Sequence, residues 1–128
     1  MENKKVFIAD DTAGIPELYR CFLEGEFIVP VVIEIFKNGT SLEKRLGENP
    51  ENLRLVLTDN QMPGITGSEI ISKYSRMPQF SNARFVLLTG DEYSVGEEAV
   101  RNGAYGYLIK PFDFKDLIRI AKDAFRQE

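Results

Sequence analysis

The sequence predicts an α/β fold, a doubly wound (βα)5 arrangement in which five parallel strands alternate with five helices. Two observations predict it. Strand-like and helix-like stretches alternate five times along the 128 residues. Several apolar runs, such as residues 55–57, are short and continuous, which is typical of parallel strands buried on both faces. Because ligands bind beyond the carboxyl ends of such strands, the residues that end each run are candidate site residues.

The first strand is expected at residues 6–9, and it ends on the acidic pair Asp10 and Asp11. In the helix that follows, Pro16 stands in the first turn, where its missing N–H costs nothing. Gly25 suits the end of this helix, since glycine readily adopts the left-handed conformation found there.

Residues 31–36 are expected to form the second strand, and the pair Asn38 and Gly39 predicts a turn. Thr40 and Glu43 have the spacing of a capping box, which predicts that a short helix starts at Thr40.

The third strand is expected to end on Asp59, after the apolar run 55–57. A second capping-box pair, Thr66 and Glu69, predicts the start of the next helix. A loop is expected from residue 77 to residue 83.

The fourth strand, residues 85–88, is expected to end on Thr89. Ser94 and Glu97 form a third capping-box pair at the start of the next helix, in which Ala99 and Val100 are expected to face inward.

The fifth strand, residues 107–109, is expected to end on Lys110 and Pro111. Asp113 is the expected cap of the last helix. An apolar stripe runs along that helix and consists of Phe114, Leu117, Ile118, Ala121, Ala124 and Phe125.

Composition narrows the class of protein. The length suits one domain, residues 1–128, and the apolar and charged fractions are those of a globular protein. A single cysteine, Cys21, suits a reducing cytosol, and neither a signal peptide nor a membrane span is expected. The net charge of −4 disfavours nucleic acid as a direct partner. Without histidine, the chain has no Ser-His or Cys-His catalysis, no His-ligated zinc and no phosphohistidine of its own.

The strand ends together predict a site for a cation and an anion. Asp10, Asp11 and Asp59 would repel one another unless a cation neutralises them, and oxygen ligands alone favour Mg²⁺, with Mn²⁺ as an alternative. Lys110 and Thr89 provide a positive charge and a hydroxyl group for a phosphoryl group. An aspartate can itself accept the phosphoryl group as an acyl phosphate.

At these residues the chain resembles the receiver domain of two-component response regulators, and in particular single-domain regulators of the chemotaxis type. The resemblance rests on ordered motifs: Asp10-Asp11, Asp59 with Met62-Pro63-Gly64 and Gly67, Thr89-Gly90, Gly103-Ala104, and Tyr107-Leu108-Ile109-Lys110-Pro111-Phe112. It implies a flavodoxin-like sheet with strand order 2-1-3-4-5.

The resemblance also implies a role for each site residue. Asp59 would be the phosphoacceptor, and Asp10 and Asp11 would hold Mg²⁺ together with Asp59 and the backbone carbonyl of Gln61. Thr89 and Lys110 would contact the phosphoryl group.

The peptide bond between Lys110 and Pro111 would be cis. On phosphorylation Thr89 would move inward and Tyr107 would follow, repacking the surface of the fourth helix, fifth strand and fifth helix. The donor would be a histidine kinase or a phosphotransfer protein, and the chain would serve signalling rather than act as a metabolic enzyme.

Two further positions are expected to tune the lifetime of the acyl phosphate. Gln61 and Asp91 each stand two residues after a key site residue, Asp59 and Thr89, beside the expected path of the attacking water. Unchanged hydrolysis rates in both Gln61→Ala and Asp91→Ala would exclude this role.

The last helix carries cations on one side and the fourth helix is acidic at its start. The cations are Lys115, Arg119, Lys122 and Arg126, and the acids are Glu92, Glu97 and Glu98. A solvated face explains both sets; the alternative is a phosphorylation-strengthened homodimer that pairs the fourth helix with the fifth.

Three other functions stay open. A haloacid-dehalogenase-type phosphatase would need an Asp-x-Asp pattern, which Asp10-Asp11-Thr12 breaks. A flavin-binding module would need a phosphate-cradling loop where the acidic pair stands. A docking module with the same fold would not need phosphorylation. The sequence identifies neither the cognate kinase nor the output.

Overall fold

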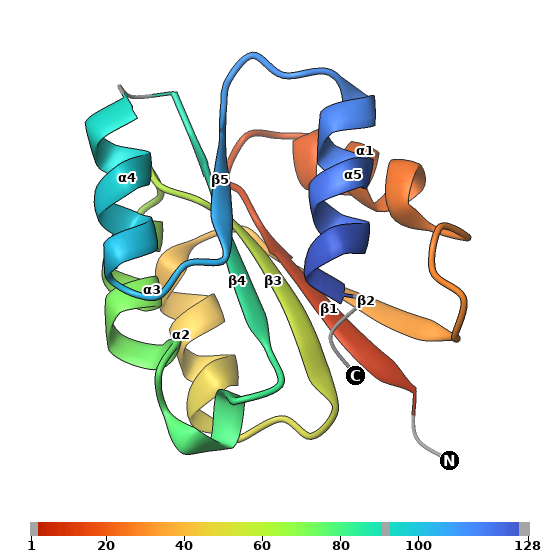
Figure 1. The fold of residues 1–128 in the computed structure, drawn as a ribbon, viewed down its shortest axis with the longest axis horizontal. Helices are drawn as coiled ribbons and strands as arrows, with labels where there is room; N and C mark the ends of the chain where they lie inside the picture. The colour runs from red at the N-terminus through yellow and green to blue at the C-terminus, as the bar shows by residue number, and fades with distance from the viewer. Residues whose placement is uncertain (1–2, 91–92, 126–128) are drawn as a thin grey trace.

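The computed structural model describes residues 3–90 and 93–125, and within them a five-stranded parallel sheet is covered by helices on both faces (Figure 1). The strands are β1 (Lys4–Ala9), β2 (Val31–Phe36), β3 (Leu53–Asp59), β4 (Arg84–Thr89) and β5 (Gly106–Ile109). The α-helices are α1 (Ile15–Leu23), α2 (Gly39–Gly47), α3 (Gly67–Tyr74), α4 (Tyr93–Arg101) and α5 (Phe114–Phe125). The strand order β2-β1-β3-β4-β5 confirms the predicted fold.

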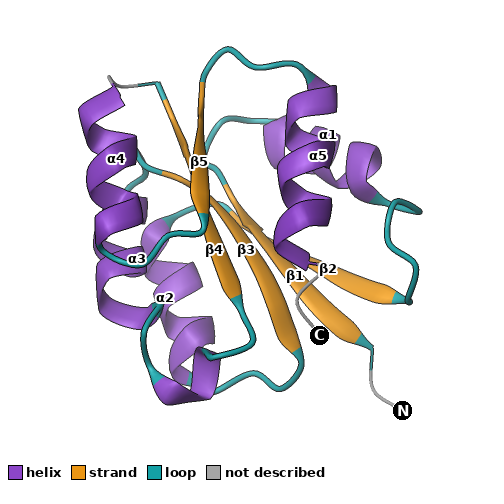
Figure 2. Ribbon diagram, viewed as in Figure 1, coloured by secondary structure: helices purple, strands orange, loops and turns teal. Residues whose placement is uncertain are grey.

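Helices α2, α3 and α4 cover one face of the sheet and α1 and α5 cover the other (Figure 2), and each face buries its own layer of the core. Successive side chains of a strand point to opposite faces, so Phe7 packs with the layer under α2, α3 and α4, whereas Ile8 packs with the layer under α1 and α5. Both side chains are fully buried. The continuous apolar runs therefore arise because both faces of the central strands are covered.

Two of the predicted helix starts are confirmed. The Thr66 hydroxyl accepts a hydrogen bond from the Glu69 N–H, and the Glu69 carboxylate accepts one from the Thr66 N–H, which completes the capping box of α3. The Asp113 carboxylate accepts a hydrogen bond from the Asp116 N–H, at 3.1 Å, in the first turn of α5.

The predicted start of α2 at Thr40 is wrong. Asn38 caps this helix, with its side-chain oxygen 2.7 Å from the Ser41 N–H. Glu43 is drawn away from the cap because its carboxylate accepts hydrogen bonds from Lys73 and the Tyr74 hydroxyl. Asparagine is a better helix cap than threonine, and the tertiary partners of Glu43 leave Thr40 without its capping-box partner.

The predicted start of α4 is also wrong, since the helix begins at Tyr93 and already includes Ser94. Ala99 faces inward as predicted, but Val100 is 41% exposed. The predicted loop after α3 contains one turn of 3₁₀-helix, Pro78–Phe80, which buries Phe80. None of the helices in residues 3–90 and 93–125 is long and apolar enough to span a lipid bilayer.

Candidate metal and phosphoryl site

Three carboxylates meet at the carboxyl ends of two adjacent inner strands. Asp10 and Asp11 follow β1, and Asp59 ends β3. Because Ala9 pairs with Thr58 across these strands, the next residues along each strand, Asp10 and Asp59, are brought together. The three side chains offer ligand oxygens within 4.8 Å of one another. Asp10 and Asp59 are buried, at 0% and 5% exposure, whereas Asp11 is exposed.

Lys110 reaches these carboxylates from the end of β5. Its Nζ lies 3.2 Å from Oδ2 of Asp10 and 3.1 Å from Oδ1 of Asp59. The Lys110 N–H donates a 2.7 Å hydrogen bond to the carbonyl of Thr89, which ties the end of β5 to that of β4. The peptide bond between Lys110 and Pro111 is cis.

Burial and charge act against each other at this site. Burial and the neighbouring charge of Asp10 raise the pKa of Asp59 above its ordinary value, although Lys110 opposes the shift. Partial burial lowers the pKa of Lys110, but the carboxylates of Asp59 and Asp10 outweigh this effect and the net shift is upward. One ammonium group faces three carboxylates, so the site retains an excess of negative charge that favours a cation.

The other sequence-predicted residues surround this cluster. Thr89 is fully buried at the end of β4, and Gln61 is exposed in the loop that follows Asp59. Tyr107 lies on β5, and its hydroxyl donates a 2.7 Å hydrogen bond to Glu97 of α4. Asp91 lies outside the described residues.

The sequence motifs do not reveal the role of Asn60, whose hydrogen bonds hold the loop between β3 and α3 in place. Its N–H donates to the carbonyl of Leu88, and its own carbonyl accepts from the Gly67 N–H at 3.1 Å. Its side-chain oxygen accepts from the N–H and the hydroxyl of Ser68, at 2.9 and 2.6 Å. These hydrogen bonds join Asn60, the residue before Gln61, to the first two residues of α3, so the two ends of the loop are held together. An asparagine eight residues before a serine carries no local signal, so the sequence could not reveal this contact.

Gly67 belongs to the motif that follows Asp59, and the structure supplies the reason for the glycine. A Cβ atom on Gly67 would collide with the backbone carbonyl oxygen of Asp59 and would stand 3.0 Å from Cδ1 of Leu87. The first residue of α3 therefore packs directly against the strand end that carries Asp59.

The donor set fits a hard divalent cation. Two buried carboxylates and one exposed carboxylate can each offer an oxygen, and no sulfur or imidazole ligand is among them. The Asp10 side chain is already oriented, because its Oδ1 accepts a 2.9 Å hydrogen bond from the Thr12 N–H. Asp10, Asp11 and Asp59 would hold the ion, with Asp11 on the solvent side.

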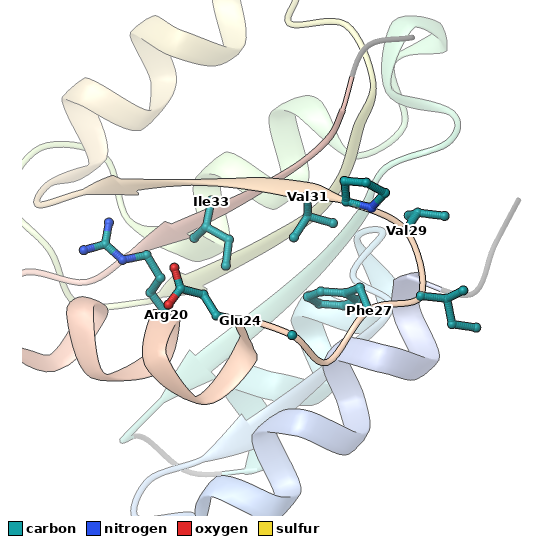
Figure 3. Close-up of a pocket in the computed structure, with 9 residues that line it drawn as sticks. Arg20, Glu24, Phe27, Val29, Val31 and Ile33 are labelled. Atoms are coloured by element: carbon teal, nitrogen blue, oxygen red, sulfur yellow. The ribbon is translucent and has the colours of Figure 1, made fainter.

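A separate hollow lies away from this rim (Figure 3). It measures about 450 Å³ and lies between the end of α1, the start of β2 and the loop that joins them. Its labelled lining side chains are Arg20, Glu24, Phe27, Val29, Val31 and Ile33. This lining combines apolar side chains with one acid and one base and contains none of the predicted site residues.

This sheet, with an acidic cluster and a lysine at the carboxyl ends of its strands, defines the receiver class of α/β signalling domains. The profile of the response regulator receiver domain matches residues 6–122, and the chain belongs to this family. Receiver domains of two-component systems bind Mg²⁺ at an acidic pocket and interact with histidine kinases or phosphotransfer proteins.

Individual relatives agree with this assignment. The chain is 31% identical over 116 residues to the uncharacterized transcriptional regulatory protein YesN of Bacillus subtilis, covering 89% of this chain but only 30% of that protein. It is 28% identical over 118 residues to sporulation initiation phosphotransferase F of the same organism, covering 91% of this chain and 90% of that one. A response regulator receiver domain protein from Clostridium thermocellum has the same fold, with a TM-score of 0.82 at 23% identity, covering 96% and 94% of the two chains.

Magnesium is expected to stabilise the protein, and the effect should shrink in acid. Mg²⁺ at about a hundred times its Kd would add ~2.7 kcal/mol to the free energy of unfolding. Because the pKa of Asp59 is raised, its ionised form destabilises the metal-free fold at pH values above that pKa. This cost decreases as the pH falls below the raised pKa, and it is gone below the ordinary pKa of an aspartate. Protonation of Asp59 also opposes metal binding. Melting temperatures with and without Mg²⁺ should therefore converge as the pH is lowered from neutral.

Two outcomes would contradict this prediction. One is a magnesium effect that is independent of pH. The other is an undiminished effect in Asp10→Asn, which replaces a buried carboxylate with a neutral amide.

Proposed function

We propose that this chain is a phosphorylation-controlled switch in which Asp59 accepts a phosphoryl group from a histidine kinase or a phosphotransfer protein. The observation that carries the proposal is the position of Lys110 Nζ, within 3.2 Å of both Asp10 and Asp59 at the acidic rim. An ammonium group held there can neutralise a phosphoryl oxygen beside the carboxylate that attacks phosphorus.

The transfer forms one bond and breaks another. An Asp59 carboxylate oxygen attacks phosphorus, the P–N bond of the donor phosphohistidine breaks, and its electron pair returns to the imidazole ring. The product is an acyl phosphate, which water later hydrolyses to restore the carboxylate. Mg²⁺, held by Asp10, Asp11, Asp59 and the backbone carbonyl of Gln61, would neutralise charge on the phosphoryl oxygens.

A donor phosphohistidine would lie outside these 128 residues, because they contain no histidine. Similarity to a protein named sporulation initiation phosphotransferase F, along nearly its whole length, supports a place in a phosphorelay. A hybrid signal transduction histidine kinase from Dictyostelium discoideum also matches, but this chain covers only 7% of it. A cytoplasmic location and a signalling role rather than a metabolic one complete the proposal.

The effect of phosphorylation would be transmitted to the surface by movements of Thr89 and Tyr107. A dianion at Asp59 would attract the Thr89 hydroxyl, and Tyr107 would fill the space that the threonine leaves. The surface of α4, β5 and α5 would then change its shape. Gln61 and Asp91 are proposed to adjust the hydrolysis rate, which the two alanine variants test.

The test is phosphorylation of the purified chain by acetyl phosphate, with and without Mg²⁺, followed by mass spectrometry of the intact protein. A magnesium-dependent gain of one phosphoryl group that is labile to hydroxylamine is expected. Borohydride reduction and peptide mapping should place the group on Asp59. An unmodified protein would contradict the proposal and favour a docking module with a receiver fold.

The homodimer through α4 and α5 is a separate prediction. Internal contacts compete with it, because Arg119 pairs with Asp116 at 3.4 Å and Lys122 pairs with Glu26 at 3.8 Å. Sedimentation velocity with Mg²⁺, with and without beryllofluoride, tests whether this homodimer forms. The hypothesis requires a shift to twice the mass on adding beryllofluoride, and a monomer in both conditions rejects it.

A further inference from the structure

Tyr107 is held against α4 by a polar contact at its hydroxyl end. Helix α4 lies alongside β5 (Figure 1), and the Tyr107 hydroxyl donates a 2.7 Å hydrogen bond to Oε2 of Glu97. The ring itself is partly buried and packs on the core layer that α2, α3 and α4 cover. The contact therefore joins the proposed switch residue to an exposed residue of the neighbouring helix.

The position of the Tyr107 ring also depends on the absence of a side chain at Gly96. A Cβ atom on Gly96 would stand 2.5 Å from both Cγ and Cε2 of Tyr107, and closer still to Cδ2. No real Cβ makes contacts this short, so the ring and any side chain at position 96 exclude each other. Glycine in the interior of a helix is less favourable than alanine, and here it creates the space that the ring occupies.

We infer that Glu97 and Gly96 form a latch that holds Tyr107 against α4 and thereby opposes the phosphorylated state of the switch. The effect on phosphorylation depends on the proposed function, whereas the effect on the position of the ring does not. Glu97 is a positioning residue in this scheme, because it acts through Tyr107 and does not touch the reacting atoms.

The latch would act by stabilising one position of the Tyr107 ring more than the other. An interaction shifts a two-state equilibrium only if it differs between the two states. The Tyr107–Glu97 hydrogen bond and the packing on Gly96 exist only while the ring lies against α4. Both therefore favour that position, and removing either should make the inward movement easier.

The two halves of the latch can be removed separately, each with a matched control. Glu97→Ala deletes the acceptor, and Glu98→Ala makes the same change of charge and helix propensity at the adjacent exposed position. Gly96→Ala fills the space beside the ring. Gly47→Ala is its control, because it adds the same methyl group to a helical glycine with nothing within 4 Å.

Two readouts follow the ring and the site independently. The chain contains five tyrosines, so fluorotyrosine labelling gives a ¹⁹F resonance for Tyr107 that Tyr107→Phe identifies by its loss. Beryllofluoride titration at saturating Mg²⁺ measures how readily the phosphoryl-like state forms. Glu97→Ala and Gly96→Ala should both move the Tyr107 resonance without any ligand, and the two controls should not.

Beryllofluoride should bind Glu97→Ala about 2- to 10-fold more tightly than wild type, the range for one hydrogen bond of ordinary net strength. In a Tyr107→Phe background, Glu97→Ala should have no further effect, since the hydroxyl donor is already gone. An unchanged affinity in both Glu97→Ala and Gly96→Ala would overturn the latch, as would equal effects of Glu97→Ala and Glu98→Ala.

Failure of the proposed function looks different from failure of the latch. If wild type does not bind beryllofluoride, the phosphorylation proposal fails, and the latch is then judged by the fluorine spectrum alone. An unmoved Tyr107 resonance in Glu97→Ala would overturn the latch whether or not beryllofluoride binds.

Discussion

Replacing Asp59 with asparagine is expected to abolish phosphorylation by acetyl phosphate while making the metal-free protein more stable. The amide lacks the nucleophilic oxygen of the carboxylate, so the covalent step is lost completely rather than slowed. It also removes one of three clustered carboxylates and leaves the buried Asp10 paired with Lys110 at 3.2 Å. Burial and like charge raise the pKa of Asp59, which means that its ionised form costs folding free energy at neutral pH.

Mass spectrometry after acetyl phosphate treatment and thermal unfolding without Mg²⁺ measure the two effects. The melting temperature should rise in Asp59→Asn, and the stabilisation by Mg²⁺ should fall sharply because a neutral amide oxygen replaces a charged carboxylate ligand. Asp113→Asn is a suitable control, because asparagine caps a helix as well as aspartate does. Magnesium-dependent phosphorylation that survives in Asp59→Asn would place the phosphoacceptor elsewhere.

Replacing Gly67 with alanine is expected to destabilise the fold by about 2–3 kcal/mol, the upper part of the range for overpacking. The added methyl group would collide with the backbone carbonyl oxygen of Asp59, which cannot turn aside as the end of a flexible side chain can. Either α3 or the end of β3 must move. The Gly67 N–H also donates to the carbonyl of Asn60, so the whole loop around Gln61 would shift with it.

Urea or thermal unfolding measures the loss of stability, and Mg²⁺ titration measures the damage to the site. Because Asp59 would be displaced, Mg²⁺ affinity should fall even though no ligand has been removed. Gly47→Ala is the control and should be neutral or slightly stabilising, since that glycine has open space around it. A Gly67→Ala protein as stable as wild type would show that the close approach to Asp59 relaxes without cost.

Much of the fold was predictable because it depends on local patterns. The apolar run that ends on Asp59 is continuous since β3 is covered on both faces, and a one-sided strand would have alternated. The Thr66–Glu69 capping box and the Asp113 cap were readable because each partner lies within three residues of the other.

The wrong predictions concern choices that other parts of the chain decide. Thr40 and Glu43 have capping-box spacing, yet Glu43 binds Lys73 and Tyr74 of α3, more than 25 residues further along the chain. Val100 follows the inward-facing Ala99 but is exposed, because successive residues on a helix point in different directions and the packing of α4 on the sheet decides which of them is buried. Local spacing cannot rank two caps when the competing partner is distant in sequence.

By itself, the sequence determined the chemistry at each strand end: carboxylates after the first and third strands, a hydroxyl after the fourth and an ammonium group after the fifth. Side-chain type and the periodicity of a strand are properties of short segments, so they can be read from the chain directly. Only the tertiary structure decided that Lys110 lies 3.2 Å from Asp10, a hundred residues away, that Gly67 abuts the carbonyl of Asp59, and that Tyr107 binds Glu97. Such distances are set by strand register and helix packing, which depend on the fit of the whole core.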